Sequence, residues 1–288
     1  MNKAIERALS ELAINSEIVA LRRVAGGDIN EAYCVETKEE KFFVKLNHRM
    51  ASDFFSFEAD GLREIGKTGT ISVPKVYGVM VDEPSGVPML WLEWVEGKKT
   101  AGTDVLLGEQ LARLHLSEGK KYGWKGTTYI GRLKQQSGWT DDWITYYRDF
   151  RLLEQAKIGE RLGVIKGGRR KKLLALIERL DEWIPRKPKA SLLHGDLWGG
   201  NWIVGGGGKP YLIDPSVFYG DHEMEIAFTE LFGGFSARFY AAYQSVFPLS
   251  REYRERKELY QLYYLLVHLN MFGEVYGASV DRILNRFV

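Results

Sequence analysis

Residues 192–215 read LLHGDLWGGNWIVGGGGKPYLIDP, and this stretch constrains the fold more strongly than any other part of the chain. A His-Gly-Asp tripeptide occupies positions 194–196, and Asn201 follows the aspartate by five residues. Four glycines at 205–208 separate two β-prone runs, which predicts a hairpin. Asp214 stands at the end of that hairpin. An acid, an amide and a second acid therefore occur at fixed spacing around one loop and one turn.

This spacing is typical of the catalytic loop of kinases. Phosphoryl transfer from ATP needs a carboxylate near the acceptor hydroxyl and hard oxygen ligands for Mg²⁺. We therefore predict that Asp196 is the catalytic base and that Asn201 and Asp214 are the metal ligands. A polar turn followed by a surface hairpin is the alternative, and the combined spacing disfavours it.

A kinase also requires a strand lysine that contacts the α- and β-phosphates and pairs with a helix glutamate. The apolar run FFVKLN supplies Lys45, and the helical pattern at 54–65 supplies Glu58. A lysine in an amphipathic strand can simply point to solvent, but the loop downstream favours the phosphate-binding role. Glu64 lies on the same helix and is the competing partner for Lys45.

Two further segments are predicted to contact the nucleotide. A turn precedes the lysine strand, and its small residues would let backbone N–H groups approach phosphates. The run LEWVEG ends the last strand of the N-terminal half, where kinases offer backbone groups to adenine; a plain edge strand with a turn is the alternative. The predicted contacts are Gly26, Gly27, Asp28, Ile29 and Asn30 in the turn, and Glu93, Trp94 and Val95 in the connector.

The residue pattern changes from strand-like to helical near position 97, which predicts an α+β chain of two lobes. Residues 1–96 hold 11 basic and 16 acidic residues, a net charge of −5, whereas the remainder carries +7. We expect an N-terminal ATP-binding lobe at 1–96 and a C-terminal catalytic and substrate-binding lobe at 97–288. Helices are expected at 1–12, 54–65, 103–115, 139–162 and 169–183, and over most of the tail from residue 225.

Composition argues against several classes of protein. The chain has 288 residues, 45% of them apolar and 27% charged, which is ordinary for a globular protein. We find no apolar run of membrane-spanning length and no secretory signal pattern at the N-terminus. Cys34 is the single cysteine, so no intrachain disulfide can form. A cytoplasmic location is expected, and the net charge of +2 gives no reason to expect a nucleic-acid partner or a membrane partner.

Longer motifs resemble one family. The form HGDLW-x-GN, together with the segments LFGGF and LNMFGEVYG near the C-terminus, resembles the fructosamine (ketosamine) 3-kinase family, which is related to aminoglycoside and choline kinases. The resemblance runs over almost the whole chain, through GGDIN, FFVKLN, LGEQLARLH and YGDHEMEIA. An acid is retained at Glu225, where that family usually carries aspartate.

The resemblance implies a bilobal protein-kinase-like fold, with a small antiparallel sheet lobe and a larger helical lobe. It implies ATP- and Mg²⁺-dependent phosphorylation of the sugar O3 of ketosamines, followed by decomposition that frees the amine. Trp198 is expected to stack on the sugar-amine face, with a buried core tryptophan as the alternative. His194 is a second candidate on the substrate side, although bracing of the loop is favoured for it. The expected partner is a small ketosamine or a glycated protein, and the expected state is a monomer or weak homodimer.

Two other functions stay open from the sequence. One is a kinase of the same fold that acts on another amino alcohol or an aminoglycoside. The other is a catalytically inactive nucleotide-binding protein, against which the presence of Lys45, Asp196, Asn201 and Asp214 argues. Only about ten residues separate Asp214 from the next expected helix, which disfavours a protein kinase with a peptide-docking segment.

Overall fold

The chain folds into two compact units in the computed structural model, which describes residues 2–25 and 29–288. Unit 1 comprises Met1–Thr103 and Trp202–Pro215, and unit 2 comprises Asp104–Asn201 and Ser216–Val288. The hairpin after the His-Gly-Asp loop therefore belongs with the N-terminal unit, whereas the sequence suggested a single boundary after residue 96.

Three contacts between the hairpin and the N-terminal part of the chain explain why the hairpin joins unit 1. Thr103 donates its hydroxyl to the Gly208 carbonyl over 2.8 Å, and Leu212 donates its N–H to the Ser72 carbonyl over 2.9 Å. Gly97 lies so close to Gly205 that a Cβ at position 97 would stand 2.0 Å from the Gly205 oxygen. These contacts join residues more than 100 positions apart, so no local pattern in the sequence reveals them.

Unit 1 is built on a five-stranded antiparallel sheet with the strand order β1-β2-β3-β5-β4. The predicted turn between the second and third strands is confirmed, because Thr37 donates its N–H to the Glu40 carbonyl over 2.9 Å. The strands are β1 (Ile18–Val24), β2 (Glu31–Thr37), β3 (Lys41–Leu46), β4 (Val76–Asp82) and β5 (Val87–Glu93). The helices are α1 (Asn2–Glu11) and α2 (Phe54–Lys67), both expected from the sequence.

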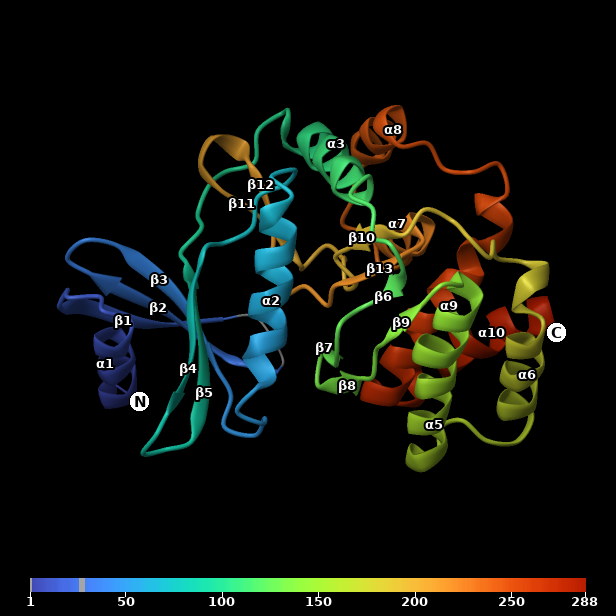
Figure 1. The fold of residues 1–288 in the computed structure, drawn as a ribbon, viewed down its shortest axis with the longest axis horizontal. Coiled ribbons are helices and arrows are strands. Elements are labelled where there is room, and N and C mark those ends of the chain that lie inside the picture. The colour runs from blue at the N-terminus through green and yellow to red at the C-terminus, as the bar shows by residue number, and fades with distance from the viewer. Residues whose placement is uncertain (1, 26–28) are drawn as a thin grey trace. The chain divides into compact units, whose positions relative to one another are not determined.

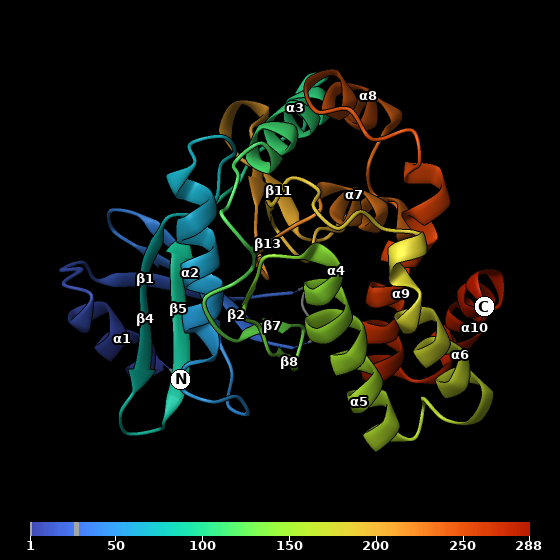
Figure 2. The same cartoon turned by 45° about the vertical axis from the view of Figure 1, so that its right-hand side comes forward.

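Strand alternation divides β3 between the two faces of this sheet. Phe42, Val44 and Leu46 belong to the core cluster that α1 completes. Lys45 points to the opposite face, where it meets α2. Figures 1 and 2 show α1 and α2 on opposite sides of the sheet. The period of two along β3 therefore aims the lysine at the helix that carries Glu58.

The second β-rich element of unit 1 is a hairpin of β11 (Trp202–Val204) and β12 (Pro210–Leu212), with a 3₁₀ turn at Gly206–Gly208. Gly207 and Gly208 have φ angles of 68° and 80°. These values lie in the left-handed region, which glycine enters without a Cβ penalty. The hairpin predicted from the glycine run is confirmed.

Unit 2 is mostly helical and is centred on α9, against which α5, α7 and α10 pack. Its N-terminal helix α3 (Thr103–His115) has the bounds expected from the sequence, and the tail is helical as expected. The other helices are α4 (Trp143–Tyr146), α5 (Leu153–Leu162), α6 (Gly167–Glu178), α7 (His222–Leu231), α8 (Ala237–Val246), α9 (Tyr253–Phe272) and α10 (Gly277–Phe287). Short 3₁₀ turns lie at Leu180–Glu182 and Glu274–Tyr276. No helix among residues 2–25 and 29–288 combines the length and apolar character needed to cross a membrane.

The prediction of a single helix at 139–162 is wrong in detail. Trp139–Thr140 forms the short strand β9, and α4 starts only after Asp142, whose side chain accepts from the Thr145 N–H over 2.8 Å. A π-helical segment, Tyr147–Leu152, then separates α4 from α5. Inside it Arg151 is fully buried, and its guanidinium lies 4.1 Å from the centre of the Phe218 ring. Burial of this one long cation accompanies the change of helix type.

Unit 2 also holds small strands that the sequence did not predict. A four-stranded sheet has the order β10-β13-β6-β9, and a separate pair joins β7 to β8. The strands are β6 (Tyr122–Gly123), β7 (Thr128–Ile130), β8 (Leu133–Gln135), β9 (Trp139–Thr140), β10 (Ser191–Leu193) and β13 (Phe218–Gly220). Runs of two or three residues are too short to show alternation. Strand β10 leads directly into the His-Gly-Asp loop and so fixes where that loop begins.

Candidate active site

In unit 1 the predicted phosphate lysine is held by two carboxylates. Lys45 Nζ lies 2.7 Å from Glu58 Oε1 and also donates to Asp214 Oδ1. The lysine is 5% exposed, so the cation is almost fully removed from water. The competing residue Glu64 instead pairs with Lys67 on the same helix, over 3.0 Å. Three residues that are far apart in the sequence thus form one charged group.

Burial and pairing act in opposite directions on this group. Burial lowers the pKa of Lys45, but the charges of Asp214 and Glu58 outweigh it and raise the pKa overall. Burial raises the pKa of Glu58 more than the charge of Lys45 lowers it. The reason is that two carboxylates share one cation, and Glu58 is the more buried of the two. Lys45 therefore carries its positive charge at neutral pH.

The backbone of Asp214 is in an uncommon conformation. Its φ angle is 57°, in the left-handed region that residues with a Cβ seldom enter. Such conformations persist when the surroundings determine them, and they cluster at functional sites. Here the conformation aims the carboxylate at Lys45, and 41% of the Asp214 side chain stays exposed.

The predicted phosphate turn is described only at its C-terminal end. Gly26, Gly27 and Asp28 lie outside the described residues. Asn47 Nδ2 donates to the Ile29 carbonyl and to Asn30 Oδ1, both over 2.9 Å. Asn47 is buried and follows Lys45 by two residues, so it connects the end of the turn to the lysine strand. Sequence reasoning missed this residue, although its place in FFVKLN was visible.

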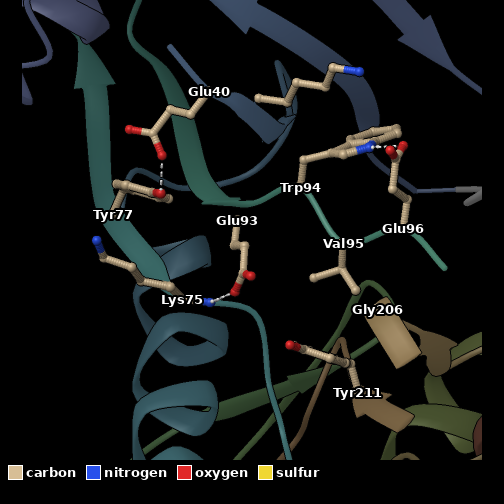
Figure 3. Close-up of a pocket in the computed structure, with 10 residues that line it drawn as sticks. Glu40, Lys75, Tyr77, Glu93, Trp94, Val95, Glu96, Gly206 and Tyr211 are labelled. Atoms are coloured by element: carbon tan, nitrogen blue, oxygen red, sulfur yellow. Dashed lines mark hydrogen bonds between the residues drawn. The ribbon is translucent and has the colours of Figure 1, made fainter. Parts of the chain in front are cut away.

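The predicted connector borders a pocket of about 480 Å³ (Figure 3). Trp94 N–H donates to the Lys41 carbonyl over 3.4 Å, and the Trp94 indole donates to Glu96 over 2.8 Å. All residues that line this pocket belong to unit 1. They are Glu40, Lys41, Lys75, Tyr77, Glu93, Trp94, Val95, Glu96, Gly206 and Tyr211. Three carboxylates and two lysines among them give the lining a formal charge of −1.

In unit 2 the catalytic-loop residues Asp196 and Asn201 are in direct contact. Asn201 Nδ2 donates to the Asp196 carbonyl over 2.7 Å and to Asp196 Oδ2 over 3.1 Å. The amide nitrogen is therefore directed at the loop. Its other atom, Oδ1, is the oxygen that a metal ion would use. Asn201 is 6% exposed, so its orientation is fixed by packing.

Glu225 of α7 fixes the start of this loop by hydrogen bonds to its backbone. Its carboxylate accepts from the His194 N–H over 3.0 Å, from the Gly195 N–H over 2.6 Å and from His115 Nε2 over 2.8 Å. Burial raises the pKa of Glu225, but the hydrogen bond and charge of His115 outweigh it and lower the pKa. Glu225 is thus an ionised, fully buried anchor. Gly195 has a φ angle of 84°, and a Cβ there would stand 1.9 Å from the Ser216 oxygen, so the position requires glycine.

The two predicted substrate residues have opposite environments. His194 is fully buried, and its Nδ1 accepts from the Asp196 N–H over 3.3 Å, which fits the favoured role of bracing the loop. A direct substrate contact of His194 stays a prediction. Trp198 is 44% exposed, which contradicts the alternative of a buried core tryptophan. Its ring covers Gly200, where a Cβ would stand 2.3 Å from the indole. Stacking of Trp198 on a substrate stays a prediction.

The oxygen donors present fit Mg²⁺. Asp214 offers a carboxylate and Asn201 a side-chain carbonyl, which are hard ligands of the kind that Mg²⁺ prefers. The described residues hold no cluster of three or more His, Cys, Asp or Glu side chains suited to a metal ion.

Known proteins are similar to this chain over its full length. A family model for fructosamine kinase matches residues 1–288. A probable ketoamine kinase of Enterococcus faecium is 38% identical over 284 residues, which cover 98% of this chain and 99% of that protein. A chloroplastic protein-ribulosamine 3-kinase of Oryza sativa subsp. japonica is 34% identical over 279 residues, 95% of this chain and 80% of that protein.

Solved structures agree with the fold inferred from the sequence. The crystal structure of an inferred fructosamine-3-kinase from Haemophilus somnus has a TM-score of 0.89 at 31% identity, covering 100% of this chain and 98% of the other. An aminoglycoside phosphotransferase has a TM-score of 0.64 at 16% identity, with 100% of both chains covered. The second likeness concerns the fold alone. The predicted α+β, protein-kinase-like fold is confirmed.

Proposed function

Because this chain belongs to the fructosamine kinase family, we propose that it transfers the γ-phosphoryl group of ATP to the O3 hydroxyl of a ketosamine. It is a phosphotransferase that acts on a sugar hydroxyl. The structural observation that carries the assignment of roles is the buried Lys45, paired with Glu58 and Asp214 in the manner that phosphate binding requires.

Lys45 is assigned to the α- and β-phosphates of ATP. Its ammonium group is charged, and Glu58 fixes its position from α2 over 2.7 Å. A fixed cation near the phosphates supplies electrostatic stabilisation without reorganisation during the reaction. The contact from Lys45 to Asp214 would be exchanged for contacts to phosphate when the nucleotide binds. Backbone groups of the turn ending at Ile29 and Asn30 and of the connector Glu93–Val95 complete the proposed nucleotide contacts.

Asp214 and Asn201 are assigned as the protein ligands of Mg²⁺. The ion would neutralise charge on the phosphate oxygens when bound. Asn201 performs two tasks in this assignment, since its nitrogen contacts Asp196 while its oxygen is left for the metal. The residue thus couples the metal ligand set to the base by one side chain.

Asp196 is assigned as the base. The O3 oxygen of the acceptor attacks the γ-phosphorus, the bond to the β,γ-bridging oxygen breaks, and ADP leaves. The O3 proton passes to the Asp196 carboxylate. The Glu225 carboxylate holds the two residues before Asp196 by their backbone N–H groups, so the position of the base is determined by a buried anchor. Positioning of this kind supplies much of the rate in phosphoryl transfer.

Trp198 is assigned to the acceptor. A ketosamine carries an amine that is cationic at neutral pH beside a sugar with apolar C–H faces. An exposed indole suits both, because its face attracts cations and packs on apolar surface. The product, a ketosamine 3-phosphate, decomposes and frees the amine, so the proposed outcome is deglycation. The cytoplasmic location and the monomeric or weakly dimeric state stay predictions.

A direct assay tests the proposal. The protein is incubated with MgATP and a ketosamine, ADP is quantified, and the product is examined by ³¹P NMR. We expect Mg²⁺-dependent ADP release and a phosphate ester at O3. Phosphate on a protein side chain, or an ester only with an aminoglycoside or a simple amino alcohol, would refute the assignment.

A competition experiment then defines the acceptor. Free ketosamine and glycated protein are supplied together, and phosphorylation of each is followed. Since the segment from Pro215 to Asp221 is too short to hold a docked peptide chain, we expect a single acceptor site and mutual competition. Undiminished phosphorylation of the glycated protein at saturating free ketosamine would contradict a single site.

A further inference from the structure

Unit 2 contains a series of buried, hydrogen-bonded side chains that leads away from the catalytic loop and that the proposed reaction does not use. This series, a chain of contacts, begins at Glu225, which holds the loop, and continues through His115, Tyr243 and His222. His115 ends α3, Tyr243 lies on α8, and His222 begins α7. Figures 1 and 2 both show α3 beside α8, and Gly108 of α3 lies within contact distance of the α8 backbone.

The distances make this a continuous set of hydrogen bonds. Tyr243 Oη lies 2.7 Å from His115 Nδ1 and 2.8 Å from His222 Nδ1. His115 Nε2 lies 2.8 Å from Glu225 Oε2. His115 and Tyr243 are fully buried and His222 is 7% exposed. Each of these contacts is therefore protected from exchange with water.

The donors in this chain follow from proton counting. Glu225 is ionised and can only accept, so His115 must carry a proton on Nε2. His115 Nδ1, on the other side of that ring, bonds to the Tyr243 hydroxyl over 2.7 Å. That hydroxyl has a single proton, so it donates to one of its two imidazole partners and accepts from the other. Burial, with the charge of His115 as a smaller cause, lowers the pKa of His222 to about 3 and keeps that ring neutral.

We propose that Tyr243 is a positioning residue for phosphoryl transfer, because its hydroxyl bonds to His115 Nδ1 and holds the ring where Nε2 donates to Glu225. The two nitrogens of one ring are thereby held at both ends, by Tyr243 and by Glu225. Without the hydroxyl, the His115 ring would be free to turn and Nε2 would move away from the Glu225 carboxylate. Glu225 would then hold the N–H groups of His194 and Gly195 less firmly. This inference rests on the proposed function for its catalytic consequence, but its structural part can be tested alone.

The test measures amide hydrogen exchange at His194 and Gly195. Tyr243→Phe keeps the ring and removes only the hydroxyl. Tyr240→Phe is the matched control, since it lies on the same helix and its hydroxyl bonds to Thr229 Oγ1 over 3.3 Å, outside the chain of contacts. We expect Tyr243→Phe to accelerate exchange at the two amides by roughly tenfold and Tyr240→Phe to leave it unchanged. Added to Glu225→Gln, Tyr243→Phe should have no further effect.

Activity provides the second readout. If Tyr243 positions the loop, Tyr243→Phe should lower kcat by about tenfold with little change in KM for ATP, because only the base is displaced. His222→Phe, which keeps the stacking on Phe247, should change both readouts in the same direction by less. Unchanged exchange at His194 and Gly195 in Tyr243→Phe would overturn the proposal, whatever the activity. A wild-type protein without ketosamine kinase activity would refute the proposed function, and the exchange data would still decide the role of Tyr243.

Discussion

The Glu225 carboxylate holds the backbone of Gly195, whose N–H donates to Glu225 Oε1 over 2.6 Å across a separation of 30 residues. Gly195 immediately precedes the proposed base, so this contact joins α7 to the site of chemistry. A buried anion of this kind is stabilised by every donor directed at it, and each donor is left unpaired if the anion is removed.

The first prediction concerns the charge of Glu225. Glu225→Gln should lower the free energy of unfolding by about 2–4 kcal/mol at pH 7, because charge-assisted bonds to three donors are weakened. The pKa of Glu225 is lowered in the folded state, so its contribution is present above the ordinary value of 4.5 and is lost as pH falls through the lowered value. Urea unfolding between pH 7 and pH 3 should therefore show that the difference in the free energy of unfolding between the wild type and Glu225→Gln shrinks as the pH falls. A difference that grows on acidification would contradict an ionised Glu225.

The second prediction separates stability from catalysis at Lys45. Lys45→Met should lower kcat/KM by orders of magnitude, because the phosphates lose their fixed cation. It should also destabilise the fold by about 3 kcal/mol, since Glu58 is left buried without its partner. Adding Glu58→Gln should restore stability without restoring activity, measured by thermal unfolding and turnover. Near wild-type turnover in Lys45→Met would show that another group binds the phosphates.

The third prediction separates the two aspartates. Asp196→Asn should keep affinity for MgATP within a few-fold and lose about 10²–10⁴-fold in kcat, because it removes the base. Asp214→Asn should weaken MgATP binding or raise the Mg²⁺ requirement, because it removes an anionic ligand. Asn201→Ala should resemble Asp214→Asn more closely than Asp196→Asn. Calorimetry across a Mg²⁺ series, paired with turnover, distinguishes the three, and the reverse pattern for the aspartates would exchange their roles.

The fourth prediction concerns Asn47, which bonds to both Ile29 and Asn30. Asn47→Ala should raise KM for ATP by about tenfold while KM for the acceptor stays within a few-fold, because two partly buried hydrogen bonds to the end of the phosphate turn are lost. Asn15→Ala, at an exposed position of the same unit, is the control. An equal effect on both KM values would indicate a general loss of structure.

The fifth prediction concerns Asp221, the N-cap of α7. Its contribution to the free energy of unfolding should depend on pH with the sign opposite to that of Glu225. Burial, followed by the charge of Glu223, raises the pKa of Asp221 from 3.8 to about 6, which corresponds to about 3 kcal/mol. A raised pKa gives stability that is present below about pH 4 and is lost as pH rises through 6. Relative to Asp221→Asn, the wild type should lose stability between pH 4 and pH 7. The exposed Asp141→Asn should show no such trend in the same urea titrations.

Much of unit 1 followed from the sequence because its signals are local. Alternation along FFVKLN placed Lys45 opposite a core face, and the helical period at 54–65 placed Glu58 on the next helix. Turn residues marked both hairpins around this region. The spacing of Asp196, Asn201 and Asp214 is likewise local, since all three lie within one stretch of 24 residues.

Tertiary structure alone decided which side chains meet across long separations. Asp214 contacts Lys45 across 169 residues, and Tyr243 contacts His115 across 128. His194 is buried and Trp198 is exposed, although the two residues stand only four positions apart in the same loop. The strands β6, β9, β10 and β13 exist because they pair with one another, as two or three residues carry no periodic signal of their own. The sequence determined the chemical groups and their local spacing, whereas packing selected the partners that orient them, because partner choice depends on burial and hydrogen-bond satisfaction summed over the whole fold.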